Sequence, residues 1–99
     1  MSTFPMDREL TITASPDAVF QEVEGEAVLL HLAQGKYFGL DEVGTRIWQL
    51  LEAHGSAGAV LDRMLEEFEV EPDRLESDLD DLLQALAENG LVTLSLAER

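Results

Sequence analysis

The stretch GKYFGLDEVGTRIWQLL, residues 35–51, contains the point where strands give way to helices. Its first part, Lys36 to Leu40, has two aromatic residues, follows a glycine and predicts a short strand. From Asp41 onward the apolar residues recur with a helical period, beginning with Val43 and Ile47. Asp41 is a good N-cap, because its carboxylate can accept hydrogen bonds from free backbone N–H groups. The spacing of apolar residues therefore changes at Asp41 from a period of two residues, typical of a strand, to a period of 3.6 residues, typical of a helix.

Two further strands are predicted upstream, at Val19–Val23 and Ala27–Leu32. The first contains β-branched and aromatic residues, and the second is an apolar run too short for a helix. Gly25 and Gly35 lie in the short turns between the three strands. This spacing predicts an antiparallel meander in which Lys36–Leu40 is the last strand.

Three helices are predicted downstream. Gly55 is a natural stop for the first helix and Ser56 an N-cap for the second. Pro72 suits the first turn of the third helix, which Asn89 and Gly90 end. Strands followed by helices predict an α+β fold. A three-stranded antiparallel sheet followed by three helices is the winged helix-turn-helix arrangement.

The length of 99 residues predicts one domain with one core. We expect residues 1–14 to form an N-terminal tail, in which Leu10–Thr13 is a candidate short strand. Residues 15–96 are expected to form the single folded domain. Its end, Leu91–Leu96, alternates loosely and is expected either to add a strand or to pack back on the core.

The chain carries 21 acidic and 6 basic residues, a formal net charge of −15. This charge disfavours binding to nucleic acids and to anionic membranes, and it favours association with positively charged partners. Solubility alone is an equally good explanation of the charge. There is no cysteine, no signal-peptide pattern and no apolar run of membrane-spanning length, so we expect a cytoplasmic protein.

No catalytic or metal-binding motif is present in the sequence. His31 and His54 do not have the spacing of a metal-binding pair, and a structural role at a helix end suits His54. Asp78, Asp80 and Asp81 lack the glycine and glutamate of a calcium loop and are better explained as a solvated helix face. We therefore expect no enzyme activity, no catalytic residues, no metal and no cofactor.

The strand Lys36–Leu40 ends the predicted sheet, and its outer side is expected to be free. An open edge can accept an extended peptide as an additional strand. Tyr37 and Phe38 point to opposite faces, so one can pack on the core while the other lines a groove. The plainer interpretation is that both are ordinary strand aromatics.

The block from Gly35 to Leu51 resembles the signature of the PqqD-like family, G-x-Y-F-x-L-N-x-x-G-x-x-I-W-x-L-L, with Asp41 in place of the asparagine. The resemblance extends over about residues 18–93. It implies a RiPP recognition element, a domain that binds the leader segment of a ribosomally made precursor peptide as a strand added between the third strand and the third helix. Carried onto this sequence, the peptide-binding residues are those on the two walls of that groove: Lys36, Tyr37, Phe38, Gly39, Asp78, Asp81, Leu82 and Ala85.

As a chain ending at Arg99, the sequence resembles the discrete recognition proteins of lasso-peptide clusters, which implies a leader peptidase as partner. A peptide chaperone for a radical-SAM maturase, as in pyrroloquinoline quinone synthesis, is the alternative. A winged-helix DNA-binding regulator is a further alternative. Against it, residues 73–89 of the third helix carry six acidic side chains and one basic one, Arg74, whereas a DNA-reading helix needs cations.

Overall fold

The computed structural model describes residues 8–24 and 26–95. The tail Met1–Asp7, the turn residue Gly25 and the end of the last predicted strand at Leu96 lie outside the described residues. Within them the elements follow one another along the chain as β1 (Thr11–Ala14), β2 (Ala18–Val23), β3 (Glu26–His31), β4 (Lys36–Leu40), α1 (Glu42–His54), α2 (Ala57–Glu67), α3 (Pro72–Glu88) and β5 (Val92–Ser95).

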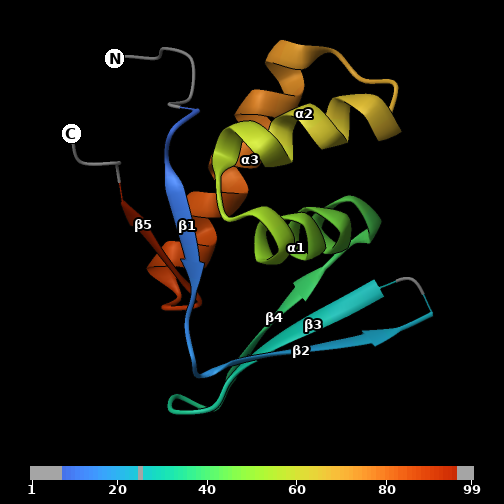
Figure 1. Ribbon diagram of the computed structural model, residues 1–99. Coiled ribbons are helices and arrows are strands. Elements are labelled where there is room, and N and C mark those ends of the chain that lie inside the picture. The colour runs from blue at the N-terminus through green and yellow to red at the C-terminus, as the bar shows by residue number, and fades with distance from the viewer. Residues whose placement is uncertain (1–7, 25, 96–99) are drawn as a thin grey trace.

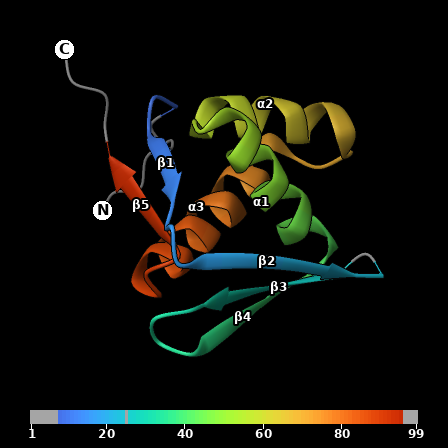
Figure 2. The same cartoon turned by 60° about the horizontal axis from the view of Figure 1, so that its bottom comes forward.

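Strands β2, β3 and β4 form an antiparallel sheet in that order, and the three helices follow it, as Figure 1 shows. The predicted α+β fold with a winged helix-turn-helix arrangement is thus confirmed. Strand β1 pairs antiparallel with β5, so that the two ends of the described chain form a separate two-stranded ribbon beside α3 (Figure 2). Ile12 in β1 is buried in the core.

The helices begin and end where the local chemistry predicts. Asp41 Oδ1 accepts a hydrogen bond from the Gly44 N–H at 2.8 Å, which caps α1. Gly55 ends that helix with φ of 74°, a left-handed conformation that glycine adopts without steric cost. Ser56 Oγ then accepts from the Ala59 N–H and caps α2. Pro72 stands in the first turn of α3.

The core lies between the inner face of the sheet and the helices. Trp48 of α1 is almost fully buried and stacks on Phe20 of β2, with ring centroids 6.5 Å apart. Leu29 in the central strand is fully buried beside them. Because these large side chains are buried between α1 and the sheet, they hold α1 against the inner face of the sheet.

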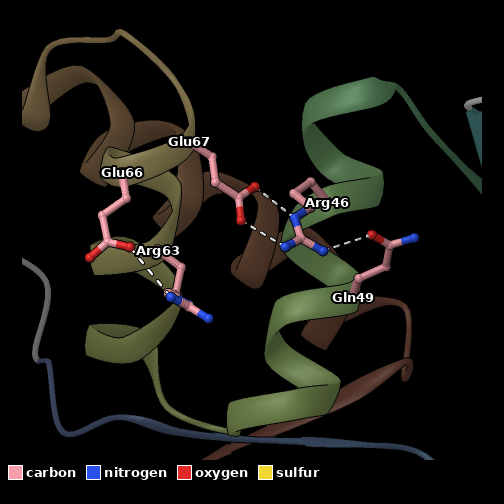
Figure 3. Close-up of polar contacts among 5 residues, drawn as sticks. All are labelled: Arg46, Gln49, Arg63, Glu66 and Glu67. Atoms are coloured by element: carbon pink, nitrogen blue, oxygen red, sulfur yellow. Dashed lines mark hydrogen bonds and ion pairs between the residues drawn. The ribbon is translucent and has the colours of Figure 1, made fainter.

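A series of side-chain hydrogen bonds connects α2 to α1, and α1 to the sheet. Arg46 makes a two-pronged contact with Glu67, at 2.7 Å for both hydrogen bonds, and a third bond to Gln49 (Figure 3). Gln49 in turn donates to Glu22 of β2 at 3.2 Å. The hydrogen bonds and charge of Arg46 hold the pKa of Glu67 below its usual value. Both partners are about one-third exposed, so solvent screens the pair.

Candidate functional site

Strand β4 is at one edge of the sheet, and no strand within residues 8–24 and 26–95 pairs with its outer side. The register pairs His31 with Lys36 and Leu29 with Phe38. The N–H of Leu32 donates a hydrogen bond to the carbonyl of Asp17, next to β2, so the backbone groups of Leu32 point toward β2. Backbone groups of successive strand residues point alternately to the two sides of the strand, so those of His31 and Leu29 point toward β4. Lys36 and Phe38 therefore use their backbone groups within the sheet.

It follows that Tyr37 and Gly39 direct their N–H and C=O groups to the open edge. Gly39 does not have a positive φ, and a Cβ added there would meet no atom within 4 Å. The fold itself therefore does not require glycine at this position. The free space keeps this part of the edge accessible.

A groove of about 510 Å³ lies beside this edge. Phe38 and Gly39 of β4 form one wall, and Asp78 and Leu82 of α3 form the other. Val43, Gly44 and Ile47, in the first half of α1, also line the groove. Phe38, Leu82 and Val43 are all partly exposed apolar side chains, so the groove offers an apolar lining next to the backbone groups at the open edge of β4.

Four of the eight predicted site residues line this groove, namely Phe38, Gly39, Asp78 and Leu82. Tyr37 is 77% exposed and lies on the opposite face of the sheet from Phe38, as the alternation along the strand requires. Lys36, Asp81 and Ala85 are outside the lining of the groove.

Sequence reasoning did not single out the residues from α1 that line the groove, Val43, Gly44 and Ile47. A signal existed in the sequence. Val43 and Ile47 are one helical turn apart, directly after the cap that ends β4, so both must face the region beside that strand. Gly44 is buried, and a Cβ there would lie 3.3 Å from Asp41 Oδ1 and from Leu40 Cδ2. A side chain at position 44 would therefore press on the cap.

Asp41 and Asp78 are the ionisable side chains among the described residues that line the groove. Asp78, Asp80 and Asp81 are exposed on α3 and do not converge. Asp78 has only a long, exposed ion pair with Arg74, at 3.8 Å. Among the described side chains, no cluster of three or more His, Asp or Glu is arranged to hold a metal ion. His31 is buried and accepts from the Gln34 N–H at 3.3 Å, and His54 ends α1.

Within residues 8–24 and 26–95, no helix combines the length and the apolarity that crossing a membrane requires. Helix α3 is strongly acidic, and five of its six acidic residues are exposed: Asp73, Asp78, Asp80, Asp81 and Glu88. The surface that a winged-helix regulator would present to DNA is therefore negative here.

Two solved structures are similar to the chain. One is TbiB1 in complex with the TbiA(beta) leader peptide, 41% identical, with 87% of this chain and 99% of that chain covered and a TM-score of 0.78. The other is lasso peptide synthetase B1 complexed with the leader peptide, 28% identical, with 84% and 98% covered and a TM-score of 0.75. No curated protein sequence matches the chain significantly.

The family whose sequence profile matches is described as Coenzyme PQQ synthesis protein D (PqqD), and the match covers residues 26–92. This range includes β3, β4, all three helices and the first residue of β5, and with them the open edge and the groove. The family match agrees with the two similar structures, both of which are bound to leader peptides. The chain belongs to the PqqD family.

Proposed function

We propose that this chain binds the leader segment of a ribosomally made precursor peptide and presents it to a processing enzyme. The observation that carries the proposal is the open edge of β4 beside an apolar groove, in a chain 41% identical to a structure that holds a leader peptide. No described group in the groove supplies chemistry, so the proposed role is recognition rather than catalysis.

Binding proceeds by strand addition. The leader lies antiparallel or parallel along β4 and exchanges hydrogen bonds with the free backbone groups of Tyr37 and Gly39. Successive side chains of an added strand point to opposite faces, so every second leader side chain enters the groove between β4 and α3. Apolar leader residues fit against Phe38, Leu82 and Val43, and a basic residue fits beside Asp78.

The processing enzyme is a leader peptidase of the lasso-peptide type, and the site of action is the cytoplasm. Similarity to a structure described as a lasso peptide synthetase B1 supports the lasso-peptide type. The family description favours one alternative, a peptide chaperone for a maturase in cofactor synthesis. Reconstitution with each class of enzyme distinguishes the two, because only the true partner gains activity toward a precursor when this chain is added.

Titration of the protein with its synthetic leader peptide tests the proposal. Binding is expected. Absence of binding at peptide concentrations up to about 100 µM, a Kd that corresponds to a binding free energy of roughly −5.5 kcal/mol, would rule the proposal out.

Val43 and Val70 provide a matched pair of variants, since these valines are 38% and 42% exposed and only Val43 lines the groove. Val43→Glu should weaken binding about tenfold or more by placing a carboxylate in the apolar contact, whereas Val70→Glu should not.

A further inference from the structure

The sheet has a second face that no described element covers. Figure 2 shows the helices and the β1–β5 ribbon on one side of β2–β3–β4 and the other side open. Two rows of side chains cross this outer face from strand to strand: Val19, Leu30 and Tyr37 in one row, and Gln21, Val28 and Gly39 in the other. Most of these residues are apolar, and Val28 is 40% and Tyr37 77% exposed.

The outer face is concave and has an acidic rim. An open hollow of about 980 Å³ lies on it, and Val28 and Gly39 are among the residues that line this hollow. Glu24, Glu26 and Asp41 are the charged residues among its described lining, which contains no Lys or Arg. An apolar hollow with a polar rim is the usual anatomy of a protein interface, and a rim of one charge favours a partner of the opposite charge.

The outer face is continuous with the edge proposed to bind the leader. Gly39, Leu40 and Asp41 line both the groove beside α3 and the outer hollow. A strand added to β4 widens the sheet, and the leader side chains that do not enter the groove are then exposed on the outer face. A protein bound on this face would contact the chain and the outward side chains of the leader together.

We infer that the outer face of the sheet is the docking surface for the enzyme that processes the leader-bearing peptide. This inference rests on the proposed leader binding. The enzyme meets the face with an apolar patch flanked by Lys and Arg, and it recognises the leader-bound form because leader side chains complete the surface. A second copy of this chain is a poor occupant, since two acidic rims would face each other.

Val28 and Val70 form a matched pair for the test, because their exposed fractions are nearly equal and only Val28 is on the outer face. Each variant, Val28→Lys and Val70→Lys, is loaded with leader peptide, and its association with the purified leader peptidase of the same biosynthetic cluster is measured by surface plasmon resonance. Val28→Lys should weaken association about tenfold or more, and Val70→Lys should leave it within about twofold. Melting temperature confirms that both variants are folded.

Leader titration of the same variants separates this inference from the proposed function. Both variants should bind leader within about twofold of wild type, since neither residue is in the groove. Equal peptidase binding by Val28→Lys and Val70→Lys would overturn the docking surface and leave leader binding intact. A wild-type dimer that Val28→Lys alone dissociates would also overturn it, in favour of a second copy. Failure of wild type to bind leader would instead refute the proposed function.

Discussion

Replacement of Gly39 by proline removes one backbone N–H from the open edge of β4 and leaves the sheet intact. Its N–H points away from β3, so no ladder hydrogen bond is lost, and proline is tolerated in edge strands whose N–H faces outward. The preceding residue, Phe38, is already extended, as a residue before proline prefers. A Cβ at position 39 meets no atom within 4 Å.

The expected cost to leader binding comes from one hydrogen bond. Tyr37 and Gly39 together offer two N–H and two C=O groups to an added strand. Proline deletes one of the N–H groups and leaves a leader carbonyl without its partner inside the complex, which costs about 1–3 kcal/mol. This free energy corresponds to a Kd raised about 5- to 150-fold.

Isothermal titration with the leader peptide measures the effect, and Gly39→Ala is the control. Alanine adds a methyl group in open space and keeps the N–H, so its Kd should stay within about twofold of wild type. Circular dichroism and thermal melting show that both variants are folded. Unchanged binding by a folded Gly39→Pro variant would refute strand addition at this edge. Leader peptides N-methylated at successive positions repeat the test on wild-type protein, where affinity should fall at every second position only.

The remaining predictions concern the cap, the core and two charged contacts. Asp41→Ala should lower the free energy of unfolding by about 1 kcal/mol in a urea titration, because the Gly44 N–H loses its acceptor, whereas Asp41→Asn should keep most of it. Trp48→Ala should cost about 3–5 kcal/mol in the same assay, and a cost under about 1 kcal/mol would contradict its place in the core. Glu67→Gln should lose stability at neutral pH but not in acid. Because the pKa of Glu67 is lowered in the folded protein, the contact with Arg46 stabilises the fold above the ordinary glutamate pKa, and this contribution is lost as the pH falls through the pKa of the folded state. The difference in free energy of unfolding between Glu67→Gln and wild type should therefore be smaller near pH 3 than at pH 7. Asp78→Asn should raise the Kd for a leader with a basic residue at the groove by up to about fivefold at low salt, with the effect absent at about 1 M salt.

Local signals predicted the elements that position the site. The strand Lys36–Leu40 has the predicted bounds, because Gly35 ends the turn before it and Asp41 caps the helix after it. The pairing of β1 with β5 was not predicted. Its partners, such as Ile12 and Leu94, are far apart in sequence, and short alternating segments do not name their partners.

The sequence also did not distinguish the two faces of the sheet. Leu29 and Leu30 are adjacent apolar residues, yet one is fully buried and the other is on the outer face. Only the register with Phe20 and Val19 on β2 assigns each to its side. The outer hollow could therefore not be predicted from the sequence, because an apolar strand residue is normally interpreted as part of the core.

Hydrogen exchange of the backbone amides, measured by NMR with and without saturating leader peptide, tests strand addition at β4 most directly. The amides of Tyr37 and Gly39 point to the open edge and should become strongly protected when the leader binds. The amides of Phe20 and Glu22, which point outward from the opposite edge at β2, should not change. Leader binding without protection of Tyr37 and Gly39, or with protection at β2 instead, would contradict the account.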